Sequence, residues 1–293
     1  MNRAKLIKLA ERLAIPLPSE MPPLESFTEF HFNTSGGKDS IALALLMLYG
    51  YKVPRHKVKF VHMRVDGPES EEAYFDYPET DAYLTYAAEK LGLELVMIAS
   101  DKGFKQRIVE RGKFPAPNAQ YCTSSLKRDV YAKWVRKKGP GHYLCLSGER
   151  SLESSRRLEI LSKGVFREYP AANAPTKGRF VDWYRPIHHL TETDVWTLME
   201  HAGIEPHPCY TKYDMSRCSC KFCFYLSPKE MLSVSKAFPE EFEALCKLEE
   251  EMGHTMRFEK GKPITLREYV AKAERDYDQI SFDEYILPCQ SVV

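Results

Sequence analysis

The chain has 293 residues, of which 43% are hydrophobic, and its formal charge at pH 7 is +1. This composition predicts a globular protein with a substantial buried core, while the net charge indicates no particular class of partner. No apolar run approaches the roughly 18 residues of a membrane-spanning helix, and the first 25 residues lack a secretory cleavage signal. Eight cysteines are too few for a disulfide scaffold. We therefore expect a cytoplasmic protein that makes no membrane contact.

Apolar extended runs alternate with helical patterns over the first two thirds of the chain. This alternation predicts βαβ units, and therefore an α/β fold with a parallel sheet and helices on both faces, over residues 1–190. For residues 191–293 the pattern predicts a helical, cysteine-rich C-terminal extension, which we expect to pack over the ligand-binding edge of the sheet. The predicted strands lie at 27–35, 58–66, 93–100, 142–150 and 180–187, and the main helical patterns at 40–51, 79–92, 126–139, 191–203 and 227–253.

A glycine loop, S-G-G-K-D-S, follows the first predicted strand and opens the next helix. Backbone amides at such a helix N-terminus point toward an anion, and glycines let a phosphate approach closely. The loop has neither the spacing of a Walker A motif nor that of a dinucleotide fingerprint. It resembles the PP-loop of ATP pyrophosphatases, which implies ATP as substrate, Mg²⁺ as cofactor, and Lys38 and Asp39 as catalytic residues. The predicted phosphate-binding residues are Ser35, Gly36, Gly37, Lys38, Asp39 and Ser40.

Two later segments resemble motifs of the phosphoadenosine phosphosulfate reductase family. The stretch "YCTSSLKRDV" at 121–130 resembles its Cys-x-x-x-x-Lys element, and "GERSLESSRR" at 148–157 resembles the element after its fourth strand. "FDYPETDAYLTY" and "RPIHHLTETDVW" add matches in the same order along the chain. The resemblance implies a Rossmann-like adenine nucleotide alpha-hydrolase fold. It adds further nucleotide- or phosphate-binding residues, namely Lys127, Arg128, Gly148, Arg150, Glu153 and Arg157.

Four cysteines crowd into residues 209–223, and thiolates at such density repel one another unless a metal neutralises them. The Cys220-x-x-Cys223 pair fits either zinc or an iron–sulfur cluster. Iron–sulfur members of the family combine a cysteine of the Cys-x-x-x-x-Lys element with a later Cys-x-x-Cys. That resemblance implies a [4Fe-4S] cluster on Cys122, Cys220 and Cys223. Cys209 or Cys218 is a candidate fourth ligand, while three ligands alone would leave one iron open to carry sulfur.

Three functions remain open. The preferred one follows from a resemblance to the ATP pyrophosphatase subunit of DNA phosphorothioation systems. It implies an enzyme that hydrolyses ATP to AMP and pyrophosphate and adenylates a nucleic-acid acceptor for sulfur incorporation. The first alternative is a sulfonucleotide reductase that uses thioredoxin and takes Cys289 as nucleophile, although the tail around Cys289 lacks the Glu, Gly and His of that family's motif. The second is a non-catalytic nucleotide-sensing subunit.

The preferred function implies further partners. One is a cysteine desulfurase or another sulfur donor, and another is DNA, contacted either directly or through partner proteins. Residues 101–140 carry eleven Lys/Arg against three Asp/Glu. This basic segment is a candidate surface for a phosphate backbone, although solvated charges on a helix surface explain it as well.

Overall fold

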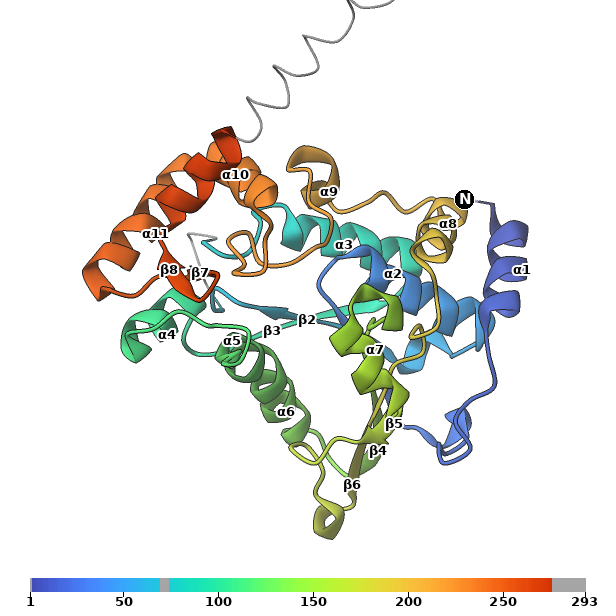
Figure 1. Ribbon diagram of the computed structural model, residues 1–293. Coiled ribbons are helices and arrows are strands. Elements are labelled where there is room, and N and C mark those ends of the chain that lie inside the picture. The colour runs from blue at the N-terminus through green and yellow to red at the C-terminus, as the bar shows by residue number, and fades with distance from the viewer. Residues whose placement is uncertain (1, 69–73, 276–293) are drawn as a thin grey trace, which may run out of the picture.

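The computed structural model describes residues 2–68 and 74–275 and contains one main sheet (Figure 1). Its strand order is β3-β2-β1-β4-β6-β5, and every neighbouring pair is parallel except β5 with β6. The parallel α/β fold predicted from the sequence is therefore confirmed, and all five predicted strands are present. The strands of this sheet are β1 (Glu29–Thr34), β2 (Val58–Arg64), β3 (Glu94–Ala99), β4 (Gly141–Leu146), β5 (Phe166–Glu168) and β6 (Arg179–Tyr184).

Helices cover both faces of the sheet, with α2 and α3 on one side and α6 on the other (Figure 1). The helices are α1 (Arg3–Leu13), α2 (Lys38–Leu45), α3 (Thr80–Leu91), α4 (Phe104–Arg111), α5 (Tyr121–Thr123), α6 (Asp129–Arg136), α7 (Ser155–Ser162), α8 (Glu192–Ala202), α9 (Pro208–Lys212), α10 (Pro228–Ala237), α11 (Pro239–Met252) and the helical residues 266–275. Two π-helical turns, η2 (Leu46–Gly50) and η4 (Ser124–Arg128), extend α2 and join α5 to α6. Short 3₁₀ turns lie at η1 (Leu24–Ser26), η3 (Arg55–Lys57), η5 (Ser151–Glu153) and η6 (Pro175–Lys177).

Side-chain alternation along β1 explains how the two faces are filled. Phe30 and Phe32 point into the core that also holds α1, α2, α3 and α8. His31 points to the other face, where its ring lies against Tyr131 and Trp134 of α6. A strand that is covered on both faces must be apolar or hydrogen-bonded along its whole length. The residues of β1 are accordingly buried or half-buried throughout.

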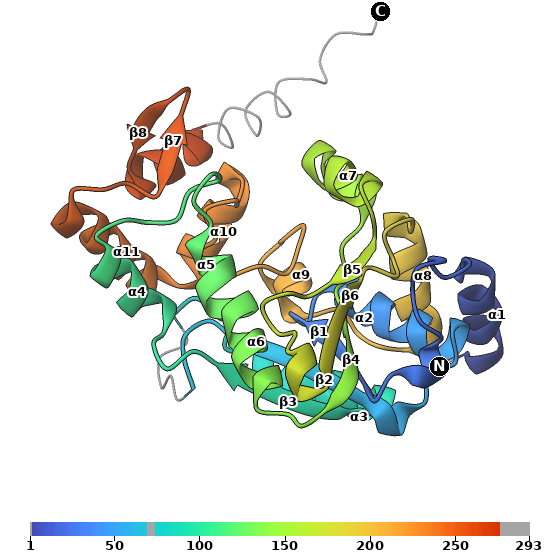
Figure 2. The same cartoon turned by 90° about the horizontal axis from the view of Figure 1, so that it is seen from below.

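The C-terminal part of the chain builds a second core beside the sheet's carboxyl edge (Figures 1 and 2). Its residues come from α9, α10, α11 and the helical segment 266–275, and residues 74–77 and 104–126 complete it. A two-stranded hairpin of β7 (Arg257–Glu259) and β8 (Lys262–Ile264) also belongs to this region and was not predicted. The first core contains α8, which packs on α1 and α2. The division of the chain at residue 190 stays a prediction.

The predicted helix over 227–253 is two helices, because the chain breaks at Phe238 and Pro239. Phe238 has φ −133° and ψ 64°, and Pro239 occupies the first turn of α11. A residue before proline avoids the helical region, and proline lacks the amide that a continuous helix needs. Among the described helices, none is both long and apolar enough to cross a membrane.

Candidate active site

The glycine loop connects β1 to α2 at the switch point between β1 and β4, where α/β sheets bind their ligands. Gly36 has φ +78°, a left-handed conformation that favours glycine. Its amide donates to Thr34 Oγ1 at 3.0 Å, and Ser40 Oγ donates to the Gly37 carbonyl at 2.8 Å. These bonds hold the loop in one shape before any ligand binds.

A cavity of about 820 Å³ lies against this loop. That volume is in the range of small-molecule sites. Five of the six predicted loop residues line it, namely Ser35, Gly37, Lys38, Asp39 and Ser40. The loops after β2 and β4, the turn around Cys122 and the segment 216–225 form the other walls. The structure therefore brings the N-terminal motifs and the cysteine-rich segment to one space.

Part of the loop is already covered by other protein groups. The hydroxyl of Tyr210 accepts hydrogen bonds from the amides of Lys38 at 3.1 Å and of Cys218 at 3.2 Å. A Cβ placed on Gly37 would lie 2.8 Å from Cys218 Cβ. A phosphate that takes the Lys38 amide must therefore displace the Tyr210 hydroxyl.

Lys38 is buried, and its ammonium group contacts the C-terminal half of the chain. Its Nζ donates to the Ser216 carbonyl at 3.0 Å and lies 3.3 Å from Glu192 Oε1. The rings of Trp196 and Tyr210 lie beside it. Sequence reasoning placed Lys38 at the phosphates but missed these contacts, which tie the loop to α8 and to the segment after α9.

Asp39 is bound by Arg150. Arg150 Nε donates to Asp39 Oδ1 at 2.5 Å, and Arg150 is only 5% exposed. Gly148 makes this approach possible, because a Cβ on Gly148 would lie 2.8 Å from the Asp39 carbonyl oxygen. A Mg²⁺ ion that binds Asp39 must share its carboxylate with the Arg150 guanidinium.

Arg157 and Glu153, both predicted to bind the nucleotide or its phosphates, also line the cavity. Arg157 Nε lies 3.3 Å from Glu153 Oε2, and its Nη1 lies 2.9 Å from Glu149 Oε2. The two carboxylates hold the guanidinium at the cavity wall. Arg157 is therefore oriented by its neighbours rather than free to rotate.

Lys127 and Arg128 separate in the structure. Lys127 lines the cavity, whereas Arg128 is exposed and absent from its lining. Burial acts to lower the pKa of Lys127, but the neighbouring Cys220 and Asp76 outweigh it and raise that pKa. Lys127 is therefore a cation held among thiols and a carboxylate, and only this member of the pair faces the site.

Cys122, Cys220 and Cys223 line one wall of the cavity. Burial raises the pKa of the Cys122 thiol, and burial raises that of Cys220 well above its ordinary value. The three sulfurs do not form a compact group of the kind that surrounds a single ion. Each thiolate of an iron–sulfur cluster binds a different iron, so such a cluster tolerates wider spacing. The donor set therefore fits a cluster better than one zinc ion.

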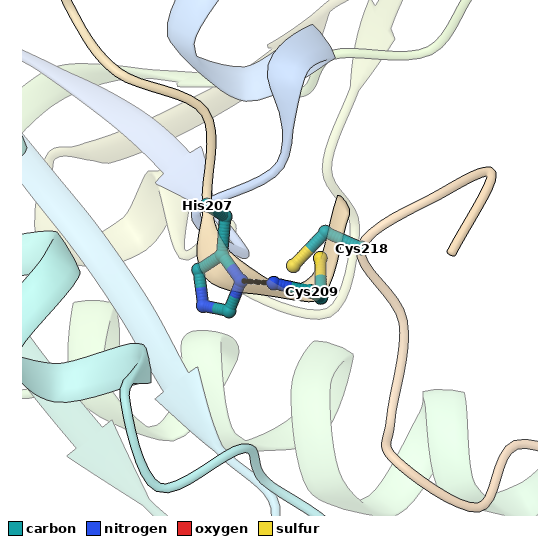
Figure 3. Close-up of side chains that lie close together, drawn as sticks. All are labelled: His207, Cys209 and Cys218. Atoms are coloured by element: carbon teal, nitrogen blue, oxygen red, sulfur yellow. Dashed lines mark hydrogen bonds between the residues drawn. The ribbon is translucent and has the colours of Figure 1, made fainter. Parts of the chain in front are cut away.

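Cys209 and Cys218, the two candidates for a fourth ligand, gather instead with His207. One ligand atom from each of these three side chains lies within 4.8 Å of the other two (Figure 3). His207 was not predicted, because its only signal in the sequence was the short spacing "HPC" before a helix. Cys145 and Cys246 are buried in the cores, and Cys289 lies outside the described residues.

Two further side chains at the cavity were missed by sequence reasoning. His62 is 5% exposed, its Nδ1 bonds the Thr34 carbonyl at 2.9 Å, and its Nε2 is buried without a partner. Burial lowers the pKa of His62. Asp76 joins the wall beside Lys127 and accepts from the amides of Val65 and Asp66. His62 lies in no quoted motif, and Asp76 lies in the stretch "FDYPETDAYLTY" without a predicted role, so only the fold shows that both line the site.

Comparison with known proteins gives one family match. The sequence matches the phosphoadenosine phosphosulfate reductase domain over residues 29–216. A curated relative, an uncharacterized 37.8 kDa protein in the gpa 5' region of Escherichia phage 186, is 26% identical over 203 residues. That alignment covers 68% of this chain and 58% of the phage protein, so the chain spans less than two thirds of the relative's length.

Two solved structures are similar at low identity. The U34-tRNA thiolase NcsA from Methanococcus maripaludis, with its [4Fe-4S] cluster, is 15% identical; the match covers 86% of this chain and 80% of the thiolase, with a TM-score of 0.45. A phosphoadenylyl-sulfate reductase from Candida auris, in complex with phosphate, is 12% identical; the match covers 68% of this chain and 93% of the reductase, with a TM-score of 0.39.

Proposed function

Because the chain belongs to the phosphoadenosine phosphosulfate reductase domain family, we propose that it is an ATP pyrophosphatase of that family. An acceptor oxygen attacks the α-phosphorus of ATP, the bond between the α-phosphorus and the bridging oxygen breaks, and pyrophosphate leaves with that oxygen. The products are an adenylated acceptor and pyrophosphate. Replacement of the adenylated oxygen by sulfur then releases AMP.

One observation carries this proposal: the glycine loop and three thiols share the walls of one cavity. Negative charge grows on the leaving pyrophosphate, and fixed donors aimed at it lower the barrier. Lys38 and the backbone of Gly37 are the loop groups that would receive such charge. Arg150 and Arg157 add cations to the cavity lining, and Asp39 is the carboxylate that Mg²⁺ would share with Arg150.

The thiol wall supports a sulfur step. Cys122, Cys220 and Cys223 would hold a [4Fe-4S] cluster, with zinc as the alternative metal. When bound, the cluster supplies iron for sulfur chemistry beside the nucleotide. The role of the chain is to place three thiolates there, and Lys127 offsets their negative charge. Because burial keeps the Cys122 and Cys220 thiols protonated, metal binding must release those protons.

We propose a nucleic acid as acceptor, with DNA phosphorothioation as the first case to test and a cysteine desulfurase as sulfur source. The basic segment 101–140 supports this only in part. Two of its lysines pair with acidic residues of the same segment, Lys102 with Glu110 and Lys133 with Asp101, and Lys138 pairs with Glu29 outside it. The positive excess of the segment is therefore offset by one outside carboxylate, and DNA contact through a partner protein stays part of the proposal.

Sulfonucleotide reduction is the second candidate, because the matching family is named for that activity. The loop and the cations would serve a sulfonucleotide phosphate equally well. The nucleophile would have to be Cys289, which lies outside the described residues.

The deciding experiment supplies the anaerobically purified protein with ATP, Mg²⁺ and a duplex DNA, and measures AMP and pyrophosphate. A parallel reaction contains phosphoadenosine phosphosulfate and reduced thioredoxin, and sulfite is measured. Pyrophosphate without sulfite supports the proposal, whereas sulfite without pyrophosphate assigns the reductase. If the protein binds nucleotide but forms neither product, the enzymatic proposal is wrong and a nucleotide-sensing role is the candidate that is left.

A further inference from the structure

We propose that His207, Cys209 and Cys218 form a zinc site, separate from the Cys122, Cys220 and Cys223 group. The three ligand atoms lie within 4.8 Å of one another, and among the described residues no other group of three His, Cys, Asp or Glu side chains meets this spacing. This site goes beyond the proposed function, because it requires neither ATP nor a sulfur step. It gives the protein a second candidate metal centre in addition to the Cys122, Cys220 and Cys223 group.

The His207 ring lies beside both thiols, and Nδ1 is the ring nitrogen that zinc would bind in place of its present hydrogen bond. Its Nε2 lies 3.2 Å from Thr80 Oγ1, and its Nδ1 accepts the Cys209 amide proton at 3.0 Å. An Nδ1 that accepts is unprotonated, so Nε2 carries the proton and donates it to Thr80. Metal-binding histidines typically donate their second ring N–H to such a partner. Figure 3 shows Nδ1 on the side of the ring that faces the two sulfurs.

The two thiols face each other beside this ring (Figure 3). Cys209 is fully buried at the start of α9, and its sulfur lies within 4.8 Å of the Cys218 sulfur. The Cys218 thiol also donates to the Ser35 carbonyl at 3.1 Å. When Zn²⁺ binds, both thiol protons leave to solvent, the Cys209 amide gives up its hydrogen bond to His207 Nδ1, and two Zn–S bonds and one Zn–N bond form. The Ser35 carbonyl loses its thiol donor in the same step.

One nitrogen and two thiolates are a donor set typical of zinc, which prefers tetrahedral N and S ligands. Three protein ligands leave one coordination position for water or a substrate group. Of the three residues, Cys218 lines the cavity. Cys218 therefore connects the proposed site to the cavity.

The site lies directly against the glycine loop. A Cβ on Gly36 would lie 3.0 Å from His207 Cδ2, and one on Gly37 would lie 2.8 Å from Cys218 Cβ. A metal that joins residues 207, 209 and 218 would therefore fix the wall that packs on both glycines. Loss of the metal should loosen the loop even when the other thiol group is intact.

The test measures zinc, iron and sulfide in the full chain, purified anaerobically without chelators. Wild type should retain about one zinc per chain at this site. Cys209→Ser and Cys218→Ser should lose zinc and keep the iron content of wild type. Cys220→Ser should do the reverse. Cys246→Ser is the matched control for Cys209→Ser, because both thiols are buried in the same core, and it should retain wild-type zinc and iron.

A second measurement serves if a cysteine variant does not fold. Metal-stripped wild type is titrated with Co²⁺, and a thiolate-to-cobalt absorption band should saturate at about one ion per chain. Thr80→Val should weaken zinc binding by about 10- to 100-fold, since it removes the hydrogen-bond partner of His207. Thr85→Val, on the exposed side of the same helix, should leave zinc affinity unchanged.

Three results would overturn the site. One is wild-type protein that holds no zinc and gives no cobalt–thiolate band. Another is zinc that disappears with Cys220 and persists without Cys209. The third is a Cys209–Cys218 disulfide in protein isolated under reducing conditions. None of these results depends on ATP turnover, so failure of this proposal and failure of the proposed function are distinguishable.

Discussion

Arg150 Nε donates a 2.5 Å hydrogen bond to Asp39 Oδ1, which joins the loop after β4 to the first turn of α2. Arg150 is almost fully buried, so this pair is largely removed from water. Breaking one partner of a buried pair leaves an uncompensated charge, which destabilises more than removing both partners.

Arg150→Met should therefore lower the free energy of unfolding by about 3–5 kcal/mol. The double variant Arg150→Met/Asp39→Asn should lose less than the sum of the two single variants. Urea unfolding without nucleotide measures both. The control is Arg64→Met, which breaks an exposed pair with Asp81 and should cost less than about 1 kcal/mol. Strict additivity of Arg150 and Asp39 would contradict the coupling.

Gly148→Ala should destabilise the protein by about 1–3 kcal/mol, because the new Cβ meets the Asp39 carbonyl oxygen and backbone cannot move aside easily. Gly139→Ala is the matched control: no atom lies within 4 Å of its built Cβ. Its stability should be unchanged or raised by up to about 1 kcal/mol. Equal effects at both glycines in thermal or urea unfolding would show that close packing at Gly148 is unimportant.

Lys38→Met should reduce pyrophosphate release by about 10²- to 10³-fold and change ATP affinity much less, if Lys38 stabilises the leaving group. Steady-state rates and a nucleotide-binding titration separate the two effects. Lys212→Met removes an exposed lysine of α9 that pairs with Glu79, and turnover should be unaffected. A Lys38 variant with equal losses in affinity and turnover would assign the residue to binding alone.

Cys122→Ser, Cys220→Ser and Cys223→Ser should each lower the iron and sulfide content of anaerobically purified protein, because each removes a predicted cluster ligand. Cys145→Ser is the control, since Cys145 is buried in β4 and bonded by Asn33. Absorption spectra with iron and sulfide analysis give the readout. Colourless wild-type protein without iron would end the cluster proposal.

Stability should fall as pH drops from about 6.5 to about 4, in part because of His31. Burial lowers the pKa of His31 to about 4. Between these values the unfolded chain takes up the proton and the folded chain does not, so acid favours unfolding. At about 1.4 kcal/mol per pKa unit, the effect reaches up to about 3 kcal/mol. Urea unfolding at several pH values should give a flatter profile for His31→Gln, and an unchanged slope would contradict this origin.

Local patterns were sufficient to predict the sheet and the glycine loop. Stretches such as 95–99 are continuous apolar runs, and the loop carries its chemistry in consecutive residues, so each is visible in one short window. The antiparallel β5 was missed because its three residues, Phe166–Glu168, form no periodic pattern. This segment is a strand because it pairs with β6.

The missed parts of the site depend on long-range contacts. Tyr210 and His207 reach the loop across more than 170 residues of chain, and nothing near them in sequence signals that contact. The motif at residues 121–130 predicted both Lys127 and Arg128 as phosphate-binding residues and did not distinguish between them. The fold separates them, because helical phase decides which one faces the cavity.

That phase is set by η4, the π-helical turn between α5 and α6. Cys122, just before this turn, and Lys127, within it, both line the cavity. Single π turns inside α-helices occur frequently at functional sites. The irregular turn of this helix therefore coincides with the thiol wall.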